Sequence, residues 1–268
     1  MRTKLLMCVL CLLSSLAWGD DRSAQQLSEL GSRSQLLCAS ALLYFNPQER
    51  EPDPRGLPAV FYHLQSLDTT IVQLGQPAKL VQPLRVMQRL FAELDGLPRS
   101  QRQRYPQLVQ ELLQQQHKLR QAAVELQAPL SPAEVETRLP LNAQSNALAS
   151  LLLDYQLRHY PLLDKAQLLM PAEALQALDR SIVQGFDTLL TSYPARDAEL
   201  RKIKSSYQFV RAELQHSTSQ THGGAEFYLG RAVTDLDELA QAVLAESERA
   251  TTAAQVDPLQ QASNWQGN

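Results

Sequence analysis

The sequence predicts an all-α protein built from up-and-down helical bundles. Leu, Ala, Gln, Glu and Arg dominate its 268 residues, all of them good helix formers, and there are only 10 glycines. Along most of the chain, apolar residues recur three and four positions apart, which is typical of helices that bury one face. Runs of β-branched residues bounded by turn residues, which would indicate strands, are missing. We therefore expect helices joined by short loops.

Residues 1–19 have the features of a secretory signal peptide. Arg2 and Lys4 precede an apolar run that starts at Leu5, and this run is shorter than the roughly 20 residues that a membrane-spanning helix needs. The small residues Ala17 and Gly19 fit the signal-peptidase pocket, which predicts cleavage before Asp20. We expect a periplasmic mature chain without a transmembrane span; an uncleaved membrane anchor is the alternative.

The charge balance argues against nucleic acid as a partner. The formal net charge is −3, and it moves to −5 when residues 1–19, which hold two basic and no acidic residues, are removed. A mildly acidic chain lacks the positive surface that binds phosphate backbones. The one basic cluster, Arg99, Arg102 and Arg104, lies in a polar connection and is expected to be a solvated loop.

Cysteine usage predicts no internal disulfide. Cys8 and Cys11 lie within the predicted signal peptide, so Cys38 is the only cysteine of the mature chain. Because its neighbours Leu37 and Ala39 are apolar, a buried, unreactive thiol is favoured over a dimer-forming or reactive one.

Residues 20–128 are predicted to form a first bundle unit. Its helices are expected at 23–45, 58–74, 80–94 and from 106 to 126, with an exposed, proline-containing loop at 46–56. The predicted inward-facing residues are Leu27, Leu30, Ser34, Leu37, Ala41, Tyr44, Phe61, Leu64, Leu67, Ile71, Leu74, Leu84, Met87, Phe91, Leu94, Leu108, Leu112, Leu119, Ala123 and Leu126.

A second unit is predicted at 143–250, after a proline-rich linker at 129–142. The stretch Ser131-Pro132-Ala133-Glu134 in this linker is a capping box for one short helix. The tail at 251–268 shows no periodicity and is predicted to be disordered. Two stripes of the second unit keep a strict helical spacing: Leu200, Ile203, Tyr207, Val210 and Leu214, then Leu229, Val233, Leu236, Ala240 and Val243.

The two units resemble each other, which suggests tandem repeats. Residues 64–73 (LQSLDTTIVQ) align without gaps to residues 175–184 (LQALDRSIVQ), with seven of ten positions identical. A proline-alanine pair opens the helix in both places, at Pro58 and Pro171. The spacing of other matches requires insertions, and a Leu/Gln-rich composition produces some matches by itself.

The chemical motifs do not assemble into a catalytic or metal site. Glu213 and His216 have the Glu-x-x-His spacing of di-iron bundles, but no second copy follows. His216 and His222 alone are too few ligands for a tight metal site. The chain also lacks a Gly-x-Ser-x-Gly elbow and a phosphate-binding glycine loop. We therefore expect a non-enzymatic protein without metal or cofactor.

One stretch of the first helix resembles a known sensor family. Leu30-Gly31-Ser32-Arg33-Ser34-Gln35-Leu36-Leu37 is similar to the first-helix motif of extracytoplasmic modules like the N-terminal domain of type IV pili methyl-accepting chemotaxis transducers. The resemblance implies helical bundles, often repeated, that sense solutes outside the cytoplasm. In nitrate-type members an arginine of this motif holds the anion. Aligned on Gly31, that arginine falls on Ser34, and Arg33 beside it is the basic residue.

Two functions follow as expectations. The first is an exported protein that binds an envelope or inner-membrane partner, in a sensor-associated or scaffold role. The alternative is a periplasmic sensor-type module that binds a small solute or anion between its helices, with Arg33 as the candidate ligand-binding residue.

Overall fold

The computed structural model describes residues 2–49, 56–127, 139–162, 166–215 and 223–264, and within these ranges it contains helices and no strand. The all-α prediction is confirmed. The long helices are α1 (Arg2–Tyr44), α2 (Gly56–Gln73), α3 (Ala78–Gly96), α4 (Tyr105–Leu126), α6 (Pro140–His159), α7 (Ala172–Ser192), α8 (Asp197–Gln215) and α9 (Gly223–Asn264). Two short 3-10 helices, η1 (Arg99–Arg104) and η2 (Pro194–Arg196), precede α4 and α8.

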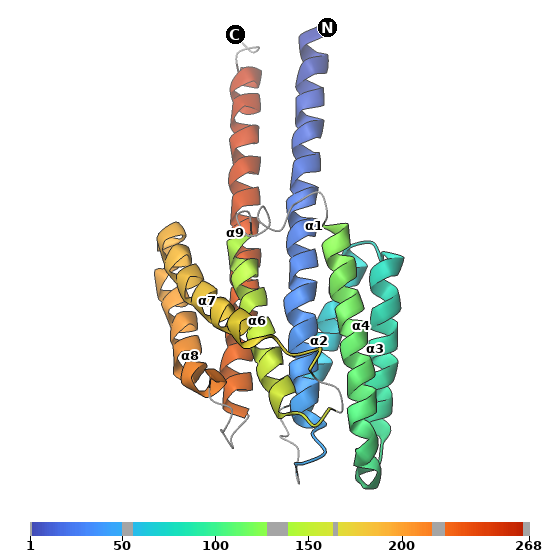
Figure 1. Cartoon of the computed structure of the whole chain (residues 1–268). Coiled ribbons are helices and arrows are strands. Elements are labelled where there is room, and N and C mark those ends of the chain that lie inside the picture. Colours follow the sequence, from blue (N-terminus) through green and yellow to red (C-terminus); the bar gives the residue numbers. More distant parts are fainter. Residues whose placement is uncertain (1, 50–55, 128–138, 163–165, 216–222, 265–268) are drawn as a thin grey trace.

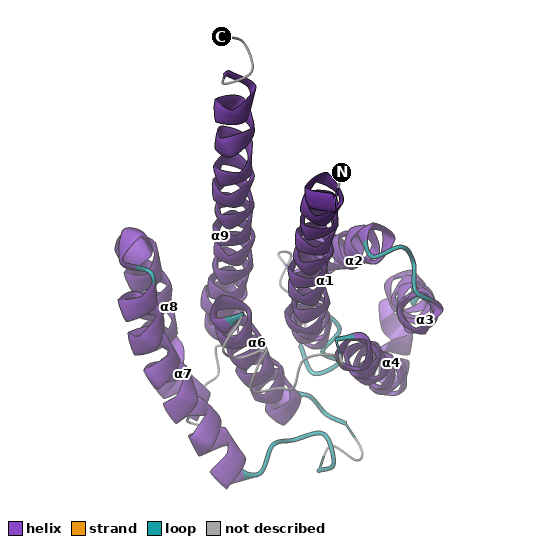
Figure 2. Cartoon of the chain, turned by 90° about the horizontal axis from the view of Figure 1, so that it is seen from above, coloured by secondary structure: helices purple, strands orange, loops and turns teal. Residues whose placement is uncertain are grey.

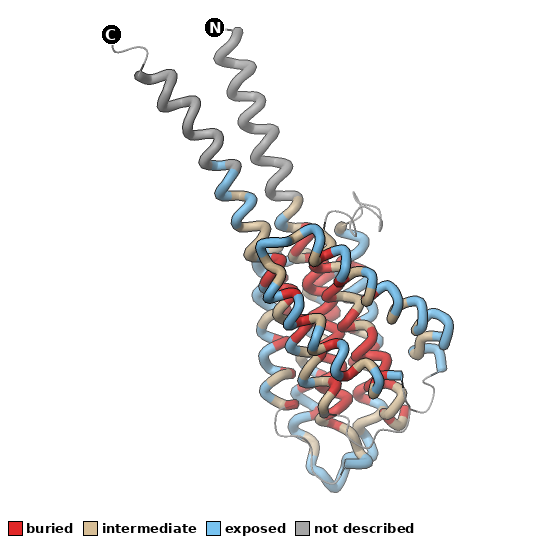
Figure 3. The backbone as a smooth tube through the Cα atoms, turned by 90° about the vertical axis from the view of Figure 1, so that its left-hand side faces the viewer, coloured by how far each residue is buried: buried red, intermediate tan, exposed pale blue. Residues whose placement is uncertain are grey.

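Helices α1 to α4 lie on one side of the molecule and α6 to α9 on the other, and α1, α6 and α9 meet in the middle (Figures 1 and 2). Helix α1 packs against α2, α4, α6 and α9. One continuous apolar core extends from Leu27 in α1 to Ala240 in α9. The bundle of Figure 3 therefore has a single buried interior that both predicted units share. Beyond this bundle, α1 and α9 extend in the same direction (Figure 1).

Helix α1 is buried on all sides rather than along one stripe. Every residue from 27 to 43 is buried, whereas the spacing of apolar residues predicts one inward face. Small residues such as Gly31, Ser32 and Ala39 let neighbouring helices approach closely on several sides. The polar side chains of this stretch are buried because they bond to each other and to α6 and α9, as described below.

The predicted helices of the first unit agree with the structure at most positions. Helix α2 ends at Gln73, and Gly75 follows with a φ of 79°, a left-handed conformation that glycine adopts without strain. Leu126 and Phe61 were predicted to face inward, and this is wrong. Leu126, the last residue of α4, is 38% exposed, and Phe61 is 50% exposed while Val60 occupies the buried position. Phe61 instead covers Phe91 edge-on from outside, with ring centroids 5.3 Å apart.

The chain ends differ from the predicted boundaries. Helix α1 begins at Arg2, so the predicted signal peptide is continuous with the first helix; cleavage before Asp20 stays a prediction. Helix α9 runs to Asn264, past the predicted end of the second unit at residue 250; disorder of the tail stays a prediction. This tail is rich in Ala and Gln, which sustain a helix without an apolar stripe.

Two further predictions concern the linker and membrane spans. Most of the linker predicted at 129–142 lies outside the described residues, but α6 begins inside it, at Pro140. Among the described helices, none combines the length and apolar character that crossing a membrane requires.

The two similar decapeptides lie in the second long helix of each half, α2 and α7. Their aligned isoleucines, Ile71 and Ile182, are both buried. The aligned aspartates have different environments: Asp68 is exposed, whereas Asp179 is bound by Arg211. The order of helices is thus compatible with a duplication, which stays a prediction.

Candidate functional site

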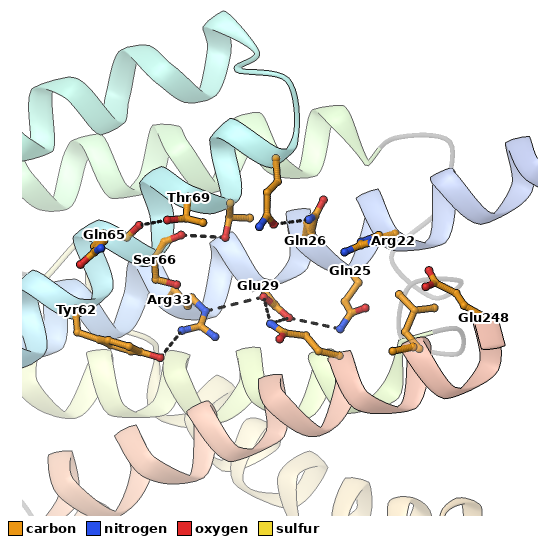
Figure 4. Close-up of a pocket in the computed structure, with 15 residues that line it drawn as sticks. Arg22, Gln25, Gln26, Glu29, Arg33, Tyr62, Gln65, Ser66, Thr69 and Glu248 are labelled. Atoms are coloured by element: carbon orange, nitrogen blue, oxygen red, sulfur yellow. Dashed lines mark hydrogen bonds and ion pairs between the residues drawn. The ribbon is translucent and has the colours of Figure 1, made fainter.

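A polar pocket of about 610 Å³ lies between α1, α2 and α9 (Figure 4). This volume falls within the range of roughly 300–1,000 Å³ that is usual for small-molecule sites. The lining residues are Arg22, Gln25, Gln26, Glu29 and Arg33 from α1, then Tyr62, Gln65, Ser66, Thr69, Thr70 and Gln73 from α2, and Gln241, Leu244, Ala245 and Glu248 from α9.

Helical spacing explains why these side chains converge. In each of the three helices the lining residues recur three and four positions apart, so they share one face. Polar stripes on α1 and α2 meet a mixed face of α9, which carries Gln241 and Glu248 beside Leu244 and Ala245. The apolar stripes at other angles hold the helices together, which leaves the polar faces to enclose the pocket.

Three charged side chains are buried at one end of this pocket. Glu29 is 3% exposed, Arg33 6% and Asp237 0%. The Arg33 Nε atom lies 4.0 Å from a Glu29 carboxylate oxygen and 3.9 Å from an Asp237 oxygen. Arg33 Nη1 donates a hydrogen bond of 3.3 Å to the Tyr62 hydroxyl, and its guanidinium carbon lies 5.9 Å from the centre of the Tyr62 ring. The arginine therefore sits between two carboxylates and against an aromatic ring; Figure 4 shows it beside Glu29 and Tyr62.

Neutral donors hold both carboxylates in place. Asp237 accepts hydrogen bonds from the hydroxyls of Ser32 in α1, at 3.0 Å, and Ser145 in α6, at 2.5 Å. Glu29 accepts two bonds from the Gln241 amide, at 2.8 and 2.9 Å, and one of 3.5 Å from Gln25. These bonds tie α1, α6 and α9 together through polar groups.

Burial changes the protonation of this cluster. Burial, together with the negative charge of Asp237, raises the pKa of Glu29 to about 7. Burial likewise raises the pKa of Asp237 to about 6, although Arg33 opposes the shift. Both shifts arise because desolvation penalises an ionised carboxylate, and one arginine does not compensate two of them. The cluster therefore changes charge near neutral pH.

His63 follows Tyr62 on α2 and lies beneath the cluster. It is buried, and burial together with the nearby Arg33 lowers its pKa to about 3. His63 is therefore neutral at physiological pH. It does not line the pocket, so it acts as part of the apolar wall behind Arg33.

The structure places the sequence-predicted residues as follows. Arg33 lines the pocket, but its guanidinium already faces Glu29 and Asp237. Cys38 is buried, as predicted, and burial raises the pKa of its thiol. Glu213 accepts a hydrogen bond of 2.8 Å from the Tyr155 hydroxyl, while His216 and His222 lie outside the described residues.

The described part of the chain holds no group of three or more His, Cys, Asp or Glu side chains arranged to bind a metal. A second hollow, of about 470 Å³, is lined by residues of α6, α7 and α8. There Asp179 is engaged by Arg211 and by the Tyr207 hydroxyl. The Arg33 cluster is thus not duplicated in the second half.

Sequence reasoning missed Glu29, Gln241 and Asp237 as site residues. The available signal was the polar spacing of Arg22, Gln25, Glu29 and Arg33, which places all four on one face of α1. That α9 comes to lie against this face could not be read from the linear chain.

No protein-family profile matches the chain, and neither a curated protein nor a solved structure shows significant similarity to it.

Proposed function

We propose that this protein is a non-enzymatic helical binding module that takes up a small polar solute in the pocket between α1, α2 and α9. The observation that carries the proposal is the convergence of polar side chains from three helices on one hollow of ligand size. Burial of a polar group costs free energy unless the group is hydrogen-bonded. A ligand that forms hydrogen bonds with the polar side chains of this hollow, next to the buried charge cluster, therefore binds favourably.

Binding is favoured over catalysis by the state of the pocket's hydroxyls. The Thr69 and Thr70 hydroxyls donate to carbonyl oxygens of their own helix, at 2.9 and 3.0 Å. Neither hydroxyl therefore donates its proton to a base that would activate the threonine as a nucleophile. Arg33, Glu29 and Asp237 form a buried ionic cluster instead of presenting an acid, a base and a nucleophile in sequence.

Filling the pocket tests the proposal. Thr69→Trp places a large side chain in the pocket, and Thr188→Trp is its matched control. Both threonines are exposed and bond to the carbonyl of a glutamine four residues earlier, but Thr188 lies on α7, away from the pocket. A bound solute stabilises the fold by about 2.7 kcal/mol at a hundredfold excess over its Kd.

We expect amines, amino acids, sugars and carboxylates, screened by thermal shift, to include a compound that stabilises the wild type and Thr188→Trp but not Thr69→Trp. If every stabilising compound acts equally on Thr69→Trp, or if none stabilises the wild type, the pocket is not a solute site.

A partner protein in the cell envelope is the second candidate function. An exposed aromatic pair favours it: Phe209 on α8 is 70% exposed, and its ring centre lies 4.7 Å from that of Tyr228 on α9. Exposed aromatic rings are typical anchors of protein interfaces.

Crosslinking in the periplasm tests this second function. The wild type should be crosslinked to one dominant partner, and Phe209→Ser should no longer be crosslinked to it. Val124→Ser, at another exposed apolar residue, should retain the partner.

The periplasmic address is part of both proposals. Mass spectrometry of the exported protein should find Asp20 as its first residue. An exported chain that keeps residues 1–19 would contradict the cleavage and indicate an anchored protein instead.

A further inference from the structure

We propose that the solute class of this pocket is a cationic amine, whose ammonium group binds Glu29. This inference rests on the proposed function and narrows it.

The charges around the pocket carry the argument. Arg33 is one positive charge between two carboxylates, Glu29 and Asp237. Asp237 does not line the pocket, whereas Glu29 does. The side of the cluster that a ligand can reach is therefore a carboxylate with an uncompensated share of negative charge. An ammonium group supplies the missing positive charge, while an anion that approaches Arg33 from the pocket meets the negative charge of the adjacent Glu29.

Hydrogen-bonding capacity around Glu29 fits an ammonium group as well. A carboxylate has about four acceptor positions, and Glu29 receives its two short bonds from the Gln241 amide nitrogen and a long one, of 3.5 Å, from Gln25. Because both amides turn their nitrogens toward Glu29, their carbonyl oxygens are the acceptor ends left for a ligand. An ammonium group has three donors and no acceptor, so it complements a site of this kind.

The shape of the pocket suggests a linear amine. Figure 4 shows Arg33 and Tyr62 at one end of the pocket, and Arg22 and Glu248 at the other. Two carboxylates thus lie along the pocket: buried Glu29, between Arg33 and Gln25, and partly exposed Glu248 near Arg22 (Figure 4). The half-exposed Tyr62 ring, which already stacks with the Arg33 cation, favours positive charge at the inner end.

The test compares three four-carbon probes whose ends are cationic, neutral or anionic. Isothermal titration calorimetry at pH 8 should show binding of butane-1,4-diamine, at least tenfold weaker binding of butane-1,4-diol and no binding of butanedioate. Glu29→Gln should weaken the diamine at least tenfold with an unchanged circular dichroism spectrum. Glu238→Gln, an exposed carboxylate on the same helix as Asp237, should leave the affinity unchanged.

Proton release provides a second readout. The charged groups that act on Glu29 are Arg33 on α1 and Asp237 on α9, and the other titratable side chains that line the pocket are Arg22, Tyr62 and Glu248. Since the pKa of Glu29 is about 7, ammonium binding at neutral pH displaces a proton from a fraction of the molecules. The diamine affinity should rise from pH 6 to pH 8 in the wild type and stay level in Glu29→Gln.

The outcomes separate the two proposals. If the diol or butanedioate binds as tightly as the diamine and Thr69→Trp abolishes that binding, the amine class is wrong and solute binding in the pocket stands. If the diamine binds equally to the wild type, Thr69→Trp and Glu29→Gln, the amine class is overturned because the probe binds elsewhere. If none of the probes and no screened compound binds, both proposals fail.

Discussion

Asp237 is a fully buried carboxylate at which three helices meet. It accepts hydrogen bonds from Ser32 of α1 and Ser145 of α6, and it lies 3.9 Å from Arg33. Buried charges of this kind rarely add net stability compared with apolar residues, but removal of one partner leaves the other uncompensated. At the scale of single residues, the central helices therefore depend on mutual satisfaction of polar groups.

Replacement of this carboxylate should be strongly destabilising. Asp237→Ala leaves Arg33 with one carboxylate, and it leaves the Ser32 and Ser145 hydroxyls only backbone carbonyls as acceptors, so we expect a loss of about 3–5 kcal/mol in the free energy of unfolding. Urea denaturation measures it. The neighbouring exposed Glu238 is the control, and Glu238→Ala should change stability by less than about 0.5 kcal/mol. Equal effects of the two substitutions would contradict this role of Asp237.

The raised pKa of Glu29 predicts that its contribution to stability falls as pH rises. Folded Glu29 binds its proton up to a pKa of about 7, whereas the unfolded side chain has the ordinary pKa of 4.5. Between these values the folded state holds more protons, so stability declines with increasing pH. His63 acts in the opposite direction, since its lowered pKa makes the fold lose stability as pH falls below 6.5.

The comparison of wild type with Glu29→Gln cancels the effect of His63. We subtract the free energy of unfolding of Glu29→Gln from that of the wild type. This difference should decrease from pH 5 to pH 8, by about 1.4 kcal/mol for each pH unit between the unfolded and the folded pKa of Glu29. Denaturation at a series of pH values checks the slope. A difference that is constant or increases with pH would contradict the protonation of buried Glu29.

At the scale of elements, α1 packs tightly against α6. Gly31 faces Asn146, and a Cβ atom added at Gly31 would lie 2.5 Å from the Asn146 side-chain oxygen. Asn146 is fixed there by hydrogen bonds of its amide nitrogen to Ser28 and to the Asn142 carbonyl. The missing side chain of Gly31 thus allows the two central helices to approach.

Substitution by alanine should lower the stability of the fold at Gly31 of α1 and raise it at Gly230 of α9. Gly31→Ala forces Asn146 away from its bonds, and we expect a loss of about 1–3 kcal/mol. Gly230→Ala meets nothing within 4 Å and should stabilise α9 by about 0.5–1 kcal/mol, because alanine is the better helix former. Thermal denaturation distinguishes them. Stabilisation by Gly31→Ala would show that the α1–α6 contact is looser than described.

At the scale of the whole molecule, the two predicted units share one core. Helix α1 packs on α2 and α4 of its own half and on α6 and α9 of the other. If one half unfolds, the other loses the surface that covers its central helices. We therefore expect residues 20–250 to behave as one cooperative body despite their repeat-like sequence.

Scanning calorimetry tests this cooperativity. The full chain should show a single unfolding transition with equal calorimetric and van't Hoff enthalpies, and Asp237→Ala should lower the temperature of the whole transition. Two resolved transitions, only one of them shifted by Asp237→Ala, would indicate two independent bundles.

The sequence by itself determined the helical class and most helix positions, because apolar spacing and helix propensity are local properties. These local properties predict the approximate boundaries of α3 and α4. They also predict the inward-facing residues Leu84, Met87 and Leu112. Arg33 also stood out, as a lone basic residue in an otherwise polar and apolar motif.

Only the tertiary structure decided what Arg33 faces. Asp237 lies some two hundred residues further along the chain, and its side chain reaches Arg33 because α9 packs on the outer face of α1. Spacing within one helix fixes which residues share a face, but not which other helix covers that face. The long-range packing of α1, α6 and α9 therefore turned a candidate anion anchor into one member of a net acidic cluster beside a polar pocket.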